Sequence, residues 1–323
     1  MTLKKGEILR TRYLITRVIG QGGMGNIYLA EDNRLKGRVC AVKEVIHDQS
    51  LGEKLIQQAK KQFFQEASVL ARLDHPNLPK VSDYFSSDNR DFLVMDYVAG
   101  DDLRTLMLKA KRQNKYLKES DVLKWAIQIG EALTYLHTQN PPIVHRDIKP
   151  GNIKLTPSGL VKLVDFGLVK ILAPGDVTIT ILQGQGTALY TPLEQYGGYN
   201  THTDIRSDIY AFASTLYHLL TNNPPTEARE RFLSPQIQPS IRSINPSIRI
   251  NTEKAIECGM RLHPDDRPDS VNEFIEDLTG QGDRDGLKTS EHIYSQLNHS
   301  LTDRKLAWIS LGLTALAFII SLI

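Results

Sequence analysis

Short strand-like runs occupy the first part of the chain. They lie at residues 13–19, 27–30 and 39–43. Runs of this length with β-branched and aromatic side chains are typical of β-strands. In residues 53–73 the apolar side chains recur instead at helical spacing. The pattern predicts a small strand-rich part with one helix at residues 13–98, after a polar entry at residues 1–12.

Longer apolar stretches with helical periodicity follow residue 98. Residues 122–137 and 209–220 show the clearest examples, and the periodicity continues to about residue 278. These stretches predict a larger, mostly helical part at residues 99–278. A chain of 323 residues with 41% hydrophobic content can bury a substantial core and corresponds to roughly two domains. The expected fold class is α+β.

The composition changes again after residue 278. Residues 279–305 are polar and read as a linker, whereas residues 306–323 carry no charge. Eighteen helical residues span roughly 27 Å, close to the thickness of a bilayer core. Arg304 and Lys305 precede this stretch, which favours a cytoplasmic position for the preceding part and places Trp308 near the interface. We expect a single-pass membrane helix, with a buried helix as the alternative, either as a tail anchor or as part of a longer protein.

Chemistry-bearing side chains gather at residues 145–152, His-Arg-Asp-Ile-Lys-Pro-Gly-Asn, and thirteen residues later at Asp165-Phe166-Gly167. Asp147 supplies a proton acceptor and Lys149 a cation, while Asn152 and Asp165 supply oxygen ligands for a hard metal ion. Phosphoryl transfer from ATP to a hydroxyl group uses such a set. The two segments in this order and spacing are a specific signal.

A glycine-rich segment lies upstream, at residues 20–27, Gly-Gln-Gly-Gly-Met-Gly-Asn-Ile. Glycine lets the backbone turn tightly and approach phosphate oxygens closely. An ordinary hairpin or a dinucleotide-binding turn could also contain it, but the latter opens a helix, and β-branched and aromatic residues follow here. Eighteen residues after Gly25, Lys43 ends the next apolar run.

These motifs resemble those of the eukaryotic-type serine/threonine protein kinases, and the arrangement of kinase, linker and one C-terminal span resembles the bacterial membrane-attached subgroup. The resemblance covers residues 13–278. It implies the bilobal protein kinase fold, with a small β-rich lobe at residues 13–98 and a larger helical lobe at residues 99–278. The implied cofactors are ATP and Mg²⁺, with Mn²⁺ as an alternative metal. The implied partners are protein substrates.

The resemblance assigns Lys43 to the α and β phosphates of ATP, with a glutamate of the following helix as its partner. Glu66 is the favoured partner because Leu70, four residues on, would share its helix face and pack toward the core. Glu53 lies too near the start of that helix.

Further catalytic roles follow from the same resemblance. Asp147 would accept the proton of the substrate hydroxyl, and Asn152 and Asp165 would bind magnesium. Lys149 would contact the transferring phosphate and indicates serine/threonine specificity. Thr187 would contact Asp147 and Lys149.

The resemblance also implies a nucleotide pocket below the glycine segment. Its expected residues are Ile19, Gly20, Gln21, Gly22, Gly23, Met24, Gly25, Asn26, Ile27, Ala41, Lys43, Met95, Asp96, Tyr97, Val98, Asp102 and Lys154. Lys154 departs from the family, which has an apolar residue beneath the adenine. Its stem could cover the base while its ammonium reaches solvent or phosphate, so we expect weaker adenine packing rather than loss of ATP binding.

Residues 186–195 match the end of the family's activation segment, although Pro192 stands one position early. Glu194 keeps the important carboxylate and would form a buried ion pair with Arg267.

Arg146 indicates a kinase whose activation segment can be ordered by phosphorylation. Within residues 168–186, Thr178 and Thr180 are the candidate sites, and trans-autophosphorylation in a homodimer is compatible with this assignment. Threonines in such a run can also be simply structural.

Two other classes of function need comparison. A catalytically inactive pseudokinase scaffold would lack one of Lys43, Asp147, Asn152 or Asp165, and all four are present. A small-molecule kinase of related fold would lack the 186–194 segment.

Overall composition adds little about partners. A net charge of +2 gives no reason to expect nucleic acid, and two cysteines indicate a reducing compartment without a disulfide framework. Cys40, in a predicted strand, is expected in the core.

Overall fold

The computed structural model describes residues 2–22, 25–45, 53–87, 90–165, 170–171, 188–196 and 204–280. Residues up to Gly280 form one compact unit. The predicted linker beyond Gly280 and the predicted membrane helix at residues 306–323 lie outside the described residues. Within these residues no helix is both long and apolar enough to cross a membrane.

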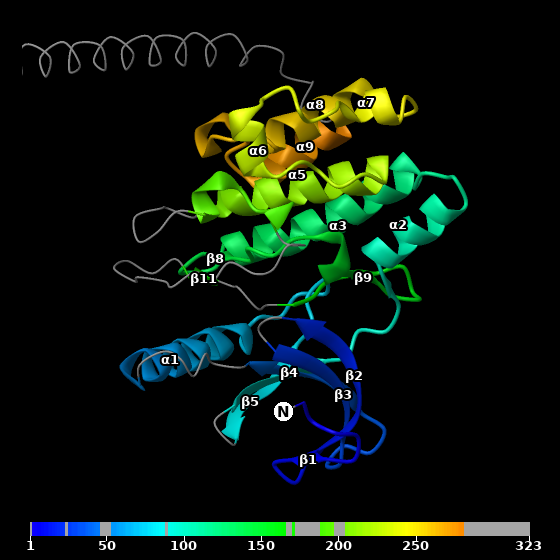
Figure 1. The fold of residues 1–323 in the computed structure, drawn as a ribbon. Helices are drawn as coiled ribbons and strands as arrows, with labels where there is room; N and C mark the ends of the chain where they lie inside the picture. The colour runs from blue at the N-terminus through cyan, green and yellow to red at the C-terminus, as the bar shows by residue number, and fades with distance from the viewer. Residues whose placement is uncertain are drawn as a thin grey trace, which may run out of the picture. The chain divides into compact units, whose positions relative to one another are not determined.

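The small lobe is built on a six-stranded antiparallel sheet with the order β1-β2-β3-β4-β6-β5. The strands are β1 (Ile8–Leu9), β2 (Tyr13–Gly22), β3 (Gly25–Asp32), β4 (Val39–Val45), β5 (Val81–Ser87) and β6 (Arg90–Asp96). Helix α1 (Glu53–Leu70) lies beside this sheet (Figure 1). The predicted strands and helix of this lobe are confirmed.

Side-chain alternation along β4 and β6 separates the two faces of the sheet. Cys40 and Val42 join an outer apolar cluster, which also contains Tyr13 and Tyr28. Ala41 belongs to a second cluster on the other face. Lys43 is two residues beyond Ala41 and shares its face, so the strand period aims this lysine toward the cleft. The core position predicted for Cys40 is confirmed.

The N-terminal segment is more ordered than the polar sequence of residues 1–12 indicates. Ile8 pairs with Leu14 across the sheet, and Leu3 and Leu9 are buried in the outer cluster. The backbone N–H of Leu3 also donates to the Tyr28 hydroxyl at 3.1 Å. Two isolated apolar residues have no periodicity, which is why the sequence pattern did not reveal this strand.

The large lobe is mainly helical. Its helices are α2 (Leu103–Arg112), α3 (Glu119–His137), α5 (Ile205–Thr221), α6 (Ala228–Leu233), α7 (Ile241–Ile244), α8 (Ile250–Gly259) and α9 (Val271–Thr279). Local chemistry sets several of their ends. Asp102 caps α2 by accepting the Thr105 N–H at 2.7 Å, and α5 ends where Asn222 adopts φ 56°.

Short strands lie between the sheet and the helices (Figure 1). They are β7 (Asp101–Asp102), β8 (Ile143–Val144), β9 (Ile153–Leu155), β10 (Val161–Leu163) and β11 (Lys170–Ile171). Strand β9 pairs with β7 and β10, and β8 pairs with β11. The loop between β8 and β9 contains the residues with the strongest predicted chemistry.

One apolar cluster connects the two lobes. It includes Ala41 and Met95 of the sheet, Leu70 of α1, Leu133 of α3 and Leu216 of α5. The outer cluster of the small lobe is separate from it. The predicted boundary at residue 98 therefore separates a strand-rich part from a helical part, but the main apolar core contains residues from both.

Candidate active site

A cleft of about 750 Å³ lies where the sheet faces the large lobe. Most of the expected nucleotide, metal and catalytic positions line it: Ile19, Gly20, Gln21, Gly25, Ile27, Ala41, Lys43, Met95, Asp96, Tyr97, Val98, Asp102, Lys149, Asn152, Lys154 and Asp165. These residues come from distant parts of the sequence. Their convergence on one cavity of this size is typical of a small-molecule site.

The glycine-rich segment forms the hairpin between β2 and β3, where Gly22 pairs with Gly25. Gly25 has φ +139°, and a Cβ there would lie 2.0 Å from the Glu44 carbonyl oxygen. This glycine is therefore required by the close approach of β4. Asn26 was expected in the pocket, but its side-chain amide donates to Glu44 Oε2 at 3.0 Å and it does not line the cleft.

Lys43 lies in β4, opposite Ile27 of β3 and Leu93 of β6. Its side chain is largely buried, and its ammonium forms an ion pair with the Asp165 carboxylate. Burial opposes ionisation of Asp165, but the charge and hydrogen bond of Lys43 hold the pKa of this carboxyl below its ordinary value. The strand lysine and the predicted metal ligand thus meet in the cleft.

Lys43 pairs with Asp165 in the described part of the chain. The expected ion pair between Lys43 and Glu66 stays a prediction. Glu66 is half-buried, and its charge acts on Arg146. Burial lowers the pKa of Arg146, whereas the negative charges of Asp208 and Glu66 oppose that decrease.

The loop after β8 organises the predicted proton acceptor. Lys149 Nζ donates to both carboxylate oxygens of Asp147, at 2.8 and 2.9 Å. Asn152 Nδ2 donates to Asp147 Oδ2 at 2.7 Å and to the Asp147 carbonyl at 2.9 Å. Burial raises the pKa of Asp147, and Lys149 opposes that rise. Two donor groups therefore fix the carboxylate through three hydrogen bonds.

A buried carboxylate beneath the loop holds its backbone. Asp208 of α5 accepts the N–H groups of His145 and Arg146, each at 2.8 Å, and lies 2.9 Å from His137 Nε2. Burial alone would raise the pKa of Asp208, but these donors hold it below its ordinary value. Arg146 adopts φ 67°, a strained conformation that this anchoring maintains.

The predicted metal ligands are also connected through the backbone. The Val164 N–H donates to the Asn152 carbonyl at 2.8 Å, which places the following residue, Asp165, beside the loop. The donor set is one carboxylate and one amide, which fits Mg²⁺ because this ion binds few protein oxygens and takes others from phosphates and water. Among the described residues no cluster of three or more His, Cys, Asp or Glu side chains could hold a metal.

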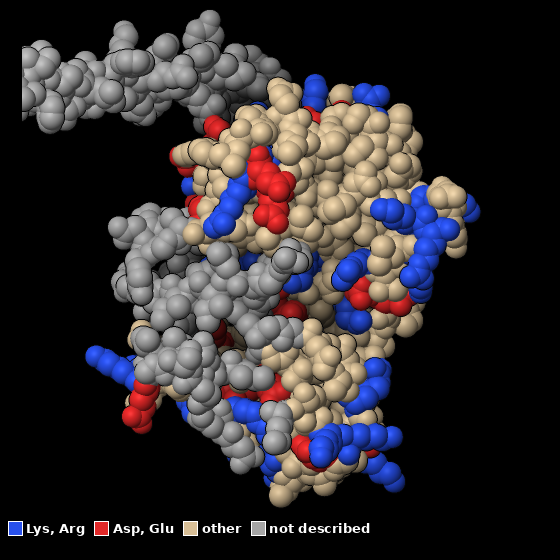
Figure 2. Space-filling model, viewed as in Figure 1, with Lys and Arg blue, Asp and Glu red and all other residues tan. Residues whose placement is uncertain are grey.

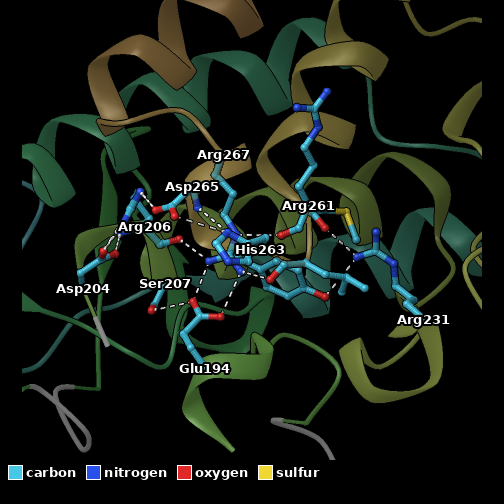
Figure 3. A network of polar contacts seen from close by, with 12 residues as sticks. Glu194, Asp204, Arg206, Ser207, Arg231, Arg261, His263, Asp265 and Arg267 are labelled. Carbon is cyan, nitrogen blue, oxygen red and sulfur yellow. Dashed lines mark hydrogen bonds and ion pairs between the residues drawn. The ribbon is translucent and has the colours of Figure 1, made fainter. Parts of the chain in front are cut away.

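The predicted pair of Glu194 and Arg267 is present (Figure 3). Arg267 donates to both carboxylate oxygens of Glu194, at 2.6 and 3.0 Å. It also donates to the carbonyls of Arg206, Arg261 and Leu262. Ser207 adds a hydrogen bond to Glu194 at 2.9 Å. This network fixes the end of the 188–196 segment against the α5 and α8–α9 regions of the large lobe.

Lys154, which was expected under the adenine from its position two residues after Asn152, lies in the wall of the cleft. It is half-buried in β9, directly opposite Asp102 of β7. Within the described residues its ammonium forms no ion pair or hydrogen bond. A cationic head in this wall is compatible with a stem that lies along the base.

Several lining residues were not expected from the sequence. They are Arg17, Pro79, Arg104, Thr105, Leu108, Gly151 and Val164. Arg17 projects from β2 two residues before Ile19, and strand alternation could have found it. Arg104, Thr105 and Leu108 belong to the first turns of α2, whose position at the mouth of the cleft is a tertiary property.

Some expected residues lie outside the described part of the chain: Gly23, Met24, Phe166, Gly167, Thr178, Thr180 and Thr187. Their assignments stay predictions.

The chain belongs to the protein kinase domain family, whose model matches residues 13–289. Serine/threonine-protein kinase PrkC of Bacillus subtilis is 33% identical over 288 residues, which are 87% of this chain and 42% of PrkC. Serine/threonine-protein kinase PknA of Nostoc is 32% identical over 288 residues, 84% of this chain and 48% of PknA. The chain therefore spans less than half the length of these relatives.

Solved structures show the same fold. The kinase domain of Mycobacterium tuberculosis PknI aligns with a TM-score of 0.66 and 27% identity, covering 87% of this chain and all of that domain. The bilobal kinase fold predicted from the motifs is confirmed.

Proposed function

We propose that the protein is a serine/threonine protein kinase that transfers the γ-phosphoryl group of ATP to hydroxyl groups of proteins. The observation that carries this proposal is the convergence of Lys43, Asp147, Asn152 and Asp165 at one cleft, with Lys43 paired to Asp165 and Asn152 paired to Asp147. A pseudokinase scaffold has no need for this complete set.

The residues divide the work of the reaction. Asp147, held by Lys149 and Asn152, accepts the proton of the attacking hydroxyl. Lys43 and Lys149 bring positive charge to the phosphates. Asn152 and Asp165 hold Mg²⁺, which supplies neutralising charge for the phosphates when it is bound. The glycine hairpin and residues 95–98 position the nucleotide.

Transfer of ³²P from labelled ATP tests the proposal directly. We expect the full chain to label casein, and the Asp147→Asn variant to lose about 10²-fold or more of this activity while still binding ATP. Sugars and aminoglycosides serve as competing acceptors. Labelling of these small molecules in place of casein would favour the small-molecule kinase, and equal labelling by the variant would contradict the role of Asp147.

We also propose attachment to the membrane through residues 306–323, with the kinase domain on the cytoplasmic side. The uncharged composition of this stretch and the preceding Arg304 and Lys305 support it. Fractionation of cells that express the chain with and without residues 306–323 tests attachment; an unchanged distribution contradicts it.

Autophosphorylation at Thr178 or Thr180, in trans within a homodimer, is the proposed means of activation. The buried Arg146 is the expected partner of the phosphate. Mass spectrometry of the wild type beside Asp147→Asn tests this. An unmodified segment in active enzyme refutes it.

A further inference from the structure

A positively charged surface extends from the cleft along α2 and the loop that follows. Between Leu103 and Lys118 the chain has six basic residues and no acidic one, although the whole chain is nearly balanced with 39 basic and 37 acidic residues. Blue side chains gather in Figure 2 where Figure 1 places α2. We call the exposed residues Lys109, Lys111, Arg112, Lys115 and Lys118 the basic α2 surface.

Most of this charge is not used inside the protein. Lys109 pairs with Asp101 at 2.6 Å, and Lys111 donates to the Asn222 carbonyl at 2.9 Å. In the described residues the side chains of Arg112, Lys115 and Lys118 form no ion pair or hydrogen bond.

Four acids flank this stretch: Asp101, Asp102, Glu119 and Asp121. Glu119 accepts hydrogen bonds from Arg249 and Thr252, which lie far from α2 in the sequence. The six basic residues outnumber the four acids, so the surface keeps a net positive charge.

Helix stability explains only part of the pattern. Basic residues in the last turn of a helix interact favourably with the helix dipole, which accounts for Lys109, Lys111 and Arg112. Lys115 and Lys118 lie beyond the end of α2, so the helix dipole does not explain the basic residues at these two positions. Leu108 and Tyr116 are also exposed, by 38% and 43%, so an occupant would find apolar contacts among the charges.

The surface is continuous with the cleft. Leu108 lines the cleft together with Arg104, Lys149 and Asp165, and Lys109 follows it directly in α2. The positive charges also act on His218 of the neighbouring α5. Burial is the largest cause that lowers the pKa of His218 to about 4, and the charges of Lys111 and Arg104 add to it. A molecule bound along α2 would lie beside the mouth of the cleft.

We propose that the basic α2 surface docks an acidic segment of the protein substrate and thereby raises the local concentration of its acceptor hydroxyl. This inference rests on the proposed kinase function and names its substrate class. A protein segment is favoured over a membrane because the surface begins directly after Leu108, which lines the catalytic cleft, and a bilayer cannot enter that cleft. Charge complementarity of this kind acts through affinity and encounter rate.

Two threonine peptides that differ only in an arm of glutamates or of glutamines test the proposal with the full chain. We expect a KM about tenfold lower for the glutamate peptide at low salt, and a smaller difference at about 0.5 M NaCl because salt screens exposed charges. The triple variant Arg112→Gln, Lys115→Gln, Lys118→Gln should lose most of this preference without altering turnover of the glutamine peptide.

The matched control removes equal charge elsewhere. Lys4→Gln, Lys5→Gln, Lys36→Gln alters three exposed lysines of the small lobe and should keep the preference. Equal KM values for the two peptides in the wild type, or a preference retained by the α2 variant, would overturn the proposal. A third outcome would also overturn it. If the wild type binds vesicles containing phosphatidylglycerol, the α2 variant does not, and neither protein prefers the glutamate peptide, then the surface faces a membrane.

Fluorescence anisotropy of the labelled peptides makes the same comparison without turnover. If no peptide is phosphorylated, the proposed function fails, while a charge-dependent difference in Kd still decides whether the α2 surface docks acidic segments.

Discussion

Asn152 donates its side-chain amide to both the carboxylate and the backbone carbonyl of Asp147, at 2.7 and 2.9 Å. One residue thus fixes the proposed proton acceptor through its amide nitrogen. If the amide oxygen of Asn152 binds Mg²⁺ as proposed, the orientation of Asp147 and metal binding are coupled.

The pH dependence of catalysis should respond to Lys149. Burial raises the pKa of Asp147, and the ammonium of Lys149 opposes the rise because it favours the carboxylate. The ionised form accepts the proton, so activity falls as pH drops through this pKa. Lys149→Ala should move the acid limb of kcat/KM to higher pH by about 1 unit or more. Lys80→Ala, at an exposed lysine, should leave the limb in place; an unmoved limb in Lys149→Ala would contradict the assignment.

Two aspartates of the site should affect stability in opposite directions. The folded state raises the pKa of Asp147, so its ionised form is disfavoured at pH 7 and Asp147→Asn should increase Tm. The folded state lowers the pKa of Asp165, so its ionised form is favoured and Asp165→Asn should decrease Tm. A change of about 1 kcal/mol corresponds to roughly 1–2 °C in a protein of this size. Differential scanning calorimetry at pH 7 measures both, and shifts of the same sign would be inconsistent with this account.

Gly25 and Gly20 provide a matched test of the hairpin. Alanine at Gly25 would place Cβ 2.0 Å from the Glu44 carbonyl at φ +139°, whereas alanine at Gly20 would make ordinary contact with Ile27 at 3.4 Å. We expect Gly25→Ala to cost about 1–3 kcal/mol and to raise the KM for ATP, and Gly20→Ala to cost less than about 1 kcal/mol. Urea unfolding and ATP titration give both quantities. Similar losses at the two positions would show that the Glu44 contact is not limiting.

The buried pair of Glu194 and Arg267 should dominate the stability of the large lobe. Removing one partner of such a pair costs about 3–5 kcal/mol because the remaining charge stays buried. Arg267→Met should therefore unfold at much lower urea concentration, and Glu194→Leu together with Arg267→Met should recover part of the loss. Recovery will be incomplete because Arg267 also donates to three backbone carbonyls. Strictly additive losses would show that the two residues do not interact.

Lys154→Leu tests the wall of the cleft. An apolar side chain should pack better against adenine than a lysine stem does, so the KM for ATP should fall, by about threefold to tenfold for the added apolar contact. Titration with ATP at fixed acceptor concentration measures it. A large increase in KM would show that the ammonium of Lys154 contacts the nucleotide.

Strand alternation, glycine spacing and the two catalytic motifs were sufficient to predict the sheet, the hairpin and most of the cleft. They could not predict that Lys43 pairs with Asp165, because the two residues are far apart in the sequence and only tertiary packing brings them together. The reason for Gly25 was also hidden, since the Glu44 carbonyl approaches it from a strand about twenty residues away. Arg104 and Leu108 entered the cleft through the packing of α2, which sequence periodicity does not specify.

The apolar cluster that joins Ala41 and Met95 to Leu133 and Leu216 limits how the enzyme can be divided or moved. A fragment that starts at residue 99 would leave the large-lobe side of this cluster in water, at a cost of about 25 cal/mol for each Å² exposed. The two lobes are therefore expected to unfold together, and split-enzyme designs that cut near residue 98 would produce aggregation-prone halves.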